Sequence, residues 1–162
     1  MKTKCHLFAA MLLISSMAFG KAALIPFDEK VAASDLIARV KIISTHKIDE
    51  PAEYLYLAKA EVLDGVKGAT TGQIIDLEFH NGMLCPNVTY IMGDDCIIFA
   101  AKMDNGHYHT INTYFGKIDI NLLKMPVGKD IEFVPGKVLG LGHDSYVVYT
   151  EAVAEIKRTM NK

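Results

Sequence analysis

Two histidines separated by one residue are the part of this sequence best suited to chemistry. His107 and His109 follow an Asp-Asn-Gly turn, within a segment that we predict to be a strand. Residues i and i+2 of a strand point to the same face, so the two imidazoles would lie side by side. Neighbouring imidazoles chelate Zn²⁺ or Cu²⁺, which makes the pair a candidate metal site. Two ligands make only half a site, and the alternative is two exposed strand histidines. His80 and His143 are further histidines that the sequence does not place.

Two acidic or catalytic-looking groups are better explained by local structure. His143, Asp144 and Ser145 contain the residue types of a hydrolase triad, but a triad converges in space rather than along the chain. The sequence also lacks a G-x-S-x-G elbow. Asp94 and Asp95 follow a glycine in a turn, where aspartate is favoured for its local hydrogen bonds. We therefore assign no catalytic residue and expect a protein that is not an enzyme.

The first twenty residues have the pattern of a secretory signal peptide. Lys2 and Lys4 precede 13 uncharged residues from Leu7 to Phe19, and positions 18 and 20 carry small residues. A charged start, a short apolar stretch and a small-residue site are typical of an export signal. The apolar stretch is shorter than the roughly 20 residues that span a bilayer. We predict cleavage after residue 20, with cleavage two or three residues later as alternatives, and a bacterial protein that is periplasmic or secreted.

After removal of the predicted signal peptide, two cysteines remain in the chain, Cys85 and Cys96. An even number of cysteines in an oxidising compartment indicates a disulfide. Closing a loop of this size stabilises a fold by about 3 kcal/mol on the chain-entropy description. Free thiols and a metal or redox pair are the alternatives, although no C-x-x-C motif is present.

Composition narrows the class of partner. The chain has 162 residues, 51% of them hydrophobic, and 17 basic against 19 acidic residues. Removal of the signal leaves 142 residues and changes the net charge from −2 to −4, because two lysines leave with it. This size fits one domain, at 21–162. An acidic exported chain without tryptophan is not expected to bind nucleic acid, and the chain after the signal has no apolar run long enough to cross a membrane.

Strands dominate the remaining pattern. Alternation and apolar runs predict strands at 36–45, 54–63, 73–79, 96–101, 107–114 and 118–123, with one more at 131–134. Glycine-rich turn chemistry fills 64–72, and 138–143 has the character of a loop. A short helix is predicted at 26–34, and a C-terminal helix is predicted at 145–160 from its helical apolar spacing. Such short strands with turn signals predict a mainly β fold, a five- to six-stranded barrel with a helix near each end.

Three motifs in this order resemble netrin-like modules. The stretch 34–43, which begins with Ser34 and Asp35, is similar to their opening strand. The stretch 60–68, which ends in Lys67 and Gly68, resembles their second element, and 93–99 resembles their late strand. The resemblance covers about 35–121 and implies an OB-fold barrel like that of the tissue inhibitors of metalloproteinases.

The inhibitory activity of that family is not implied for this chain. Those inhibitors chelate the protease zinc with a cysteine at the mature N-terminus, whereas the first cysteine after the predicted cleavage site here is Cys85. We therefore expect an exported binding module with no cofactor, contacting a protein or cell-envelope partner. The alternative function is a periplasmic metal-binding protein that holds Zn²⁺ or Cu²⁺ through His107 and His109.

Overall fold

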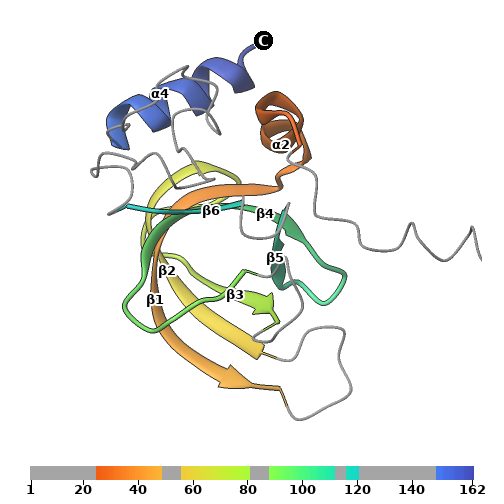
Figure 1. The fold of residues 1–162 in the computed structure, drawn as a ribbon, viewed down its shortest axis with the longest axis vertical. Helices are drawn as coiled ribbons and strands as arrows, with labels where there is room; N and C mark the ends of the chain where they lie inside the picture. The colour runs from red at the N-terminus through yellow and green to blue at the C-terminus, as the bar shows by residue number, and fades with distance from the viewer. Residues whose placement is uncertain (1–24, 49–55, 81–87, 112–115, 121–148) are drawn as a thin grey trace, which may run out of the picture.

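The structure, a computed structural model, describes residues 25–48, 56–80, 88–111, 116–120 and 149–162 (Figure 1). The helices and strands within these residues are, in chain order, α2 (Phe27–Ala33), β1 (Leu36–Lys47), β2 (Tyr56–Lys67), β3 (Ile74–Phe79), β4 (Asp95–Lys102), β5 (Tyr108–Thr110), β6 (Lys117–Asp119) and α4 (Tyr149–Met160).

Five of the strands close a barrel. They follow the order β1-β2-β3-β5-β4, and the ring closes because β1 pairs with β2 on one side and with β4 on the other. Only the pairing of β3 with β5 is parallel; the others are antiparallel. The extra strand β6 pairs with β4, beyond the residues that β5 uses. The predicted mainly β, OB-like barrel with two helices is therefore confirmed.

The long strand β1 pairs with two neighbouring strands and contributes side chains to the barrel interior. Val40 pairs with Val62 of β2 and with Cys96 of β4. Alternate side chains of β1 enter the core, as the sequence pattern predicted, and these are Leu36, Ala38, Val40 and Ile42. Three register shifts interrupt its pairing with β2. Such irregularities bend a strand, which lets a small barrel close.

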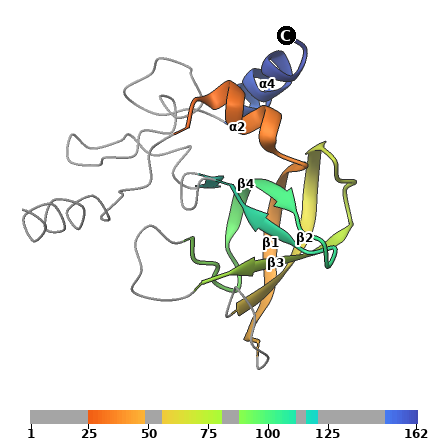
Figure 2. The same ribbon diagram turned by 90° about the vertical axis from the view of Figure 1, so that its right-hand side faces the viewer.

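A second apolar layer covers part of the barrel from outside. Ile37, Ile97, Phe99 and Ile118 are fully or almost fully buried, but they belong to a different cluster from the barrel core. The helices α2 and α4 cover these four side chains. The two helices contact each other and lie over the same end of the molecule (Figures 1 and 2). This two-sided burial explains why β4 is a continuous apolar run rather than an alternating one.

The motif residues of the netrin-like resemblance meet where α2 joins the barrel. Ser34 Oγ donates to the carbonyl of Lys30 at 2.7 Å, which closes the end of α2. Lys67 Nζ, from the end of β2, donates to the carbonyl of Val31 at 2.9 Å. The Asp35 carboxylate accepts the backbone N–H of residue 102 at 2.8 Å. Gly68 follows Lys67 with a φ of +65°, and its Cα lies against the backbone carbonyl of Asp35, so a Cβ there would collide.

Several predicted boundaries were wrong. The strand β2 continues to Lys67, where we predicted turn chemistry from residue 64 onward. Pairing with β1 holds this segment extended, and the register shifts beside Gly65 absorb its irregularity. β5 ends at Thr110 and β6 ends at Asp119, before the predicted ends of these strands. The helix α4 is described from Tyr149 onward, and its predicted start at 145 lies outside the described residues. The predicted signal peptide, the strand at 131–134 and the loop at 138–143 lie outside the described residues. No helix among the described residues is long and apolar enough to cross a membrane.

Candidate functional site

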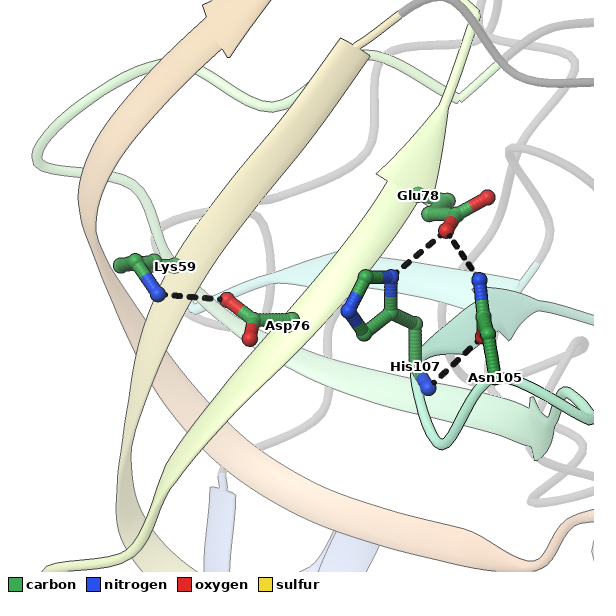
Figure 3. Close-up of polar contacts among 5 residues, drawn as sticks. All are labelled: Lys59, Asp76, Glu78, Asn105 and His107. Atoms are coloured by element: carbon green, nitrogen blue, oxygen red, sulfur yellow. Dashed lines mark hydrogen bonds and ion pairs between the residues drawn. The ribbon is translucent and has the colours of Figure 1, made fainter. Parts of the chain in front are cut away.

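The outer face of β2 and β3 carries a polar row that continues into the turn between β4 and β5 (Figure 3). The inner face of β3 is apolar, with Ile75 and Leu77 in the core. The alternate side chains point outward, because successive residues of a strand face opposite sides. Asp76 is one of them, and its carboxylate accepts a hydrogen bond from Lys59 Nζ of β2 at 3.0 Å. This pair is exposed, so it contributes little to stability.

The next outward residue, Glu78, is almost completely buried. Its side chain is 6% exposed, although it lies on the outer face. Two donors from the β4–β5 turn converge on one of its oxygens, Oε1: Asn105 Nδ2 at 2.8 Å and His107 Nδ1 at 2.6 Å. Asn105 Oδ1 in turn accepts the backbone N–H of His107 at 3.0 Å. The three residues form a closed cluster that fastens the turn to β3 (Figure 3).

The cluster assigns the proton of His107. An ionised carboxylate can only accept hydrogen bonds, so Nδ1 must carry the hydrogen that points at Glu78. In the neutral ring Nε2 then has the lone pair, and Figure 3 shows Nε2 turned away from Glu78. The His107 side chain is 33% exposed. This arrangement fixes the orientation of the ring, with Nε2 on the side away from Glu78.

His109 lies opposite the same residue in the neighbouring strand. It is the register partner of Glu78 in the parallel pairing of β3 with β5. Of the two predicted metal ligands, His107 thus contacts this buried acid, whereas His109 is placed opposite it by strand pairing. His143 is outside the described residues, and the residues that the structure describes contain no group of three or more His, Cys, Asp or Glu side chains that could hold a metal ion.

The predicted Cys85–Cys96 disulfide stays a prediction, because Cys85 lies outside the described residues. Cys96 is in β4, fully buried in the barrel core, and is a free thiol in the structure. Burial raises the pKa of this thiol, and the negative charges of Asp119 and Asp94 raise it further, against the lowering effect of Lys117. A protonated, buried thiol is a poor nucleophile and a poor metal ligand.

The aspartates at 94 and 95 are used in structural ion pairs. Asp94 accepts the backbone N–H of Ile91 at 3.0 Å and pairs with Lys117 Nζ at 2.6 Å. Asp95 binds the guanidinium of Arg39 through both oxygens, at 2.6 and 2.8 Å. The expectation of local hydrogen bonding in a turn holds for Asp94, and each carboxylate also has a cation opposite it.

Sequence reasoning missed Glu78 and Asn105. Glu78 was visible only as an outward position of a predicted strand, and Asn105 only as part of a turn. Their meeting depends on the parallel pairing of β3 with β5, because Glu78 is 29 positions from His107 and 27 from Asn105 in the sequence. An acid at an outward position followed by an Asn-Gly-His turn is the weak signal that was available.

Comparison with known proteins identifies no match for this chain, either to a protein-family model or to a curated protein.

Proposed function

We propose that this protein is an exported, non-enzymatic binding module that contacts a protein or cell-envelope partner through an apolar turn at one end of β4. The observation that carries the proposal is the exposure of Ile91 and Met92, whose surfaces are 64% and 70% accessible. Two consecutive large apolar side chains this exposed cost free energy in water unless a partner covers them.

The turn is held rigidly. The backbone N–H of Gly93 donates to the carbonyl of Ile42 at 2.8 Å, and the N–H of Ile42 donates to the carbonyl of Asp94 at 2.9 Å. These bonds seat the turn on β1 beside Ile43, which is itself 40% exposed. A fixed presentation lowers the conformational entropy that binding would cost, which favours a recognition role.

The netrin-like relationship is part of this proposal. Its support is the closed strand order of the barrel and the meeting of the motif residues Asp35, Lys67 and Gly68 at one joint. A binding role is the expectation that this resemblance brings. The missing N-terminal cysteine keeps zinc-chelating protease inhibition outside the proposal.

Site-specific crosslinking tests the role of the turn. A photoreactive amino acid at position 92 should yield a discrete adduct in cells, and Ile91→Ser should abolish it. The matched control is Ile74→Ser, which removes an exposed isoleucine (51%) from β3, two strands away from β1. An adduct that survives Ile91→Ser, or that is lost equally with Ile74→Ser, contradicts the assignment. Absence of any adduct at 92 does the same.

A further inference from the structure

We propose that the partner of the apolar turn binds as an extended polypeptide segment, which adds a strand to the open edge of β1 at residues 44–47. This inference rests on the binding role proposed above and names the class of partner. The segment carries an apolar side chain toward the turn and an acidic side chain toward the other end of the edge. In this mode of recognition, main-chain hydrogen bonds supply affinity and side-chain contacts supply selection.

The last part of β1 is paired on one side only. Residues 44–47 pair with residues 56–59 of β2. The pairing with β4 ends one residue after Lys41, at the two backbone hydrogen bonds of Ile42. In the part of the chain that the structure describes, no strand pairs with the other edge of 44–47, which continues below β4 in Figure 1. Backbone groups of a strand point alternately to its two edges, so about half of those in these residues are open to a further strand.

The conformation of the apolar turn keeps this edge open. Gly93 has a φ of +95°, which directs the chain away from β1 immediately before β4. Asp94 Oδ2 accepts the backbone N–H of Ile91 at 3.0 Å and Lys117 Nζ at 2.6 Å. Lys117 Nζ also donates to the carbonyl of Thr89 at 3.0 Å, so both sides of the turn are held. These contacts prevent the chain before β4 from extending along β1, and the edge is left for another chain.

The end of this edge next to the turn is apolar. Ile43 lies between Ile42, which bonds to the turn, and Ser44, where the open edge begins. Its surface is 40% exposed, and Ile91 and Met92 are exposed in the turn itself. A strand laid along the edge places a side chain against these residues and removes apolar surface from water. This contact selects an apolar residue in the partner segment.

The other end of the edge is basic. His46 and Lys47 are exposed, and neither forms an ion pair with a carboxylate of the described residues. At about 3.3 Å per residue, Lys47 lies about 13 Å along the strand from Ile43. Opposite charges on neighbouring strands stabilise their pairing. The partner segment is therefore expected to carry an acidic residue about four positions from its apolar residue.

Photocrosslinking at three positions tests the strand. A photoreactive amino acid is placed at position 44, 46 or 92 of the full chain, and the partner residues captured in cells are mapped by mass spectrometry. Positions 44 and 46 share one face of β1, so they should capture residues two apart in a single partner segment, because paired strands advance together. The residue captured from position 92 should lie in the same segment. Position 74 in β3, two strands away from β1, is the matched control and should not capture this segment.

The outcomes distinguish failure of the strand from failure of the binding role. An adduct at position 92 without adducts at both 44 and 46 refutes strand addition and leaves the apolar turn as the contact. Capture of unrelated segments, of residues spaced as in a helix, or of a segment without an acidic residue refutes it as well. Adducts at 44 and 46 without one at 92 refute the shared surface. Absence of an adduct at all three positions contradicts both proposals.

A second measurement needs neither a variant nor a partner. Hydrogen exchange of the free wild-type protein, followed amide by amide by NMR, should alternate along residues 44–47. Amides that point to β2 should be protected by their hydrogen bonds, and those that point to the open edge should exchange faster. Protection of all four amides would show that the edge is already covered and would exclude strand addition. Fast exchange of all four would show that β1 does not hold this edge in an extended conformation, which also refutes the inference.

Discussion

Burial destabilises the charged forms of two side chains, Cys96 in β4 and Lys30 in α2. For the thiol this means loss of reactivity, since only the thiolate is a good nucleophile. For the amine it means loss of its proton at a lower pH, because a charge in an apolar environment is poorly solvated. Each effect can be measured at the single residue.

Cys96 should resist alkylation in the folded protein. Its side chain has no exposed surface, and burial raises the pKa of its thiol. Iodoacetamide added to the native protein in the presence of reductant should leave Cys96 unmodified in the peptide mass spectrum, and addition in concentrated urea should modify it fully. Equal labelling in both conditions would show that β4 is not packed as described.

The same reagents test the predicted bridge to Cys85. Alkylation in urea of protein purified without reductant should leave both cysteines unmodified, because a disulfide has no thiol to react. Two alkylated residues would refute the disulfide.

Lys30 should make stability increase with pH in the alkaline range. Its side chain is fully buried, its ammonium lies 5.3 Å from the centre of the Phe99 ring, and burial lowers its pKa from 10.5 to about 8. Between those values the unfolded chain keeps a proton that the folded chain has lost. The free energy of unfolding therefore rises with pH from about 8 to 10.5 and is lowest below that range.

Urea unfolding of wild type and Lys30→Met at pH 7 and at pH 10 measures this. The difference in free energy of unfolding between the two proteins should shift by about 1–3 kcal/mol in favour of wild type on going to pH 10. A difference that does not change with pH would contradict the lowered pKa.

At the scale of elements, the joint between α2 and the barrel depends on close backbone contact at the end of β2. Ser34 and Lys67 satisfy carbonyls at the end of α2, in the way that helix C-termini require. Gly68 lets the chain turn there with a positive φ and without a side chain between β2 and Asp35. These contacts give the motif residues a structural role.

Gly68→Ala should destabilise the protein far more than Gly72→Ala. Both glycines have positive φ, +65° and +84°, so both substitutions carry the strain of the left-handed region, about 1–2 kcal/mol. Only at Gly68 would the new Cβ also collide with backbone, at the carbonyl of Asp35; at Gly72 the space is open. We expect Gly68→Ala to cost about 3 kcal/mol or more by urea unfolding. Similar costs at the two positions would argue against the close approach.

At the scale of the whole molecule, two apolar layers share the wall formed by β1 and β4. One is the barrel core and the other is the layer under α2 and α4. A polar network joins α4 to β1 and β2. Tyr149 Oη donates to Asp64 at 2.5 Å, and the guanidinium of Arg39 lies 5.2 Å from the centre of the Tyr149 ring. Burial and the hydrogen bond to Asp64 raise the pKa of Tyr149, so its hydroxyl stays a donor over the ordinary pH range.

Tyr149→Phe should loosen α4 from the barrel while leaving the ring in place. Loss of a hydrogen bond to a charged acceptor should lower the free energy of unfolding by about 1–2 kcal/mol. Backbone amides of α4 should also exchange with deuterium faster. Tyr108→Phe is the matched control, because the Tyr108 ring packs on the core and its hydroxyl has no hydrogen-bond partner in the described part of the chain. Equal effects of the two substitutions would exclude a special role for the Tyr149–Asp64 bond.

The sequence by itself determined the class of fold and its main elements. Apolar alternation located β1, a continuous apolar run located β4, and helical spacing located α4, because each pattern reflects the neighbours that a residue must pack against. Turn chemistry was a weaker guide. Asp64 and Gly65 favour a turn locally, but the ladder to β1 holds them in a strand.

Tertiary structure alone decided what surrounds each chemical group. The sequence marked His107 and His109 as candidates, yet it was silent on Glu78, the acid that orients His107. Likewise, no local pattern indicated that Ile37 would be buried under α2 and α4 while Ile91 and Met92 stay exposed. The physical reason is the same in each case. The periodicity of a sequence shows which side chains of a strand share a face. Burial and pairing depend on which distant segments pack against that strand, and here these segments are β5, paired in parallel with β3, and the helices α2 and α4.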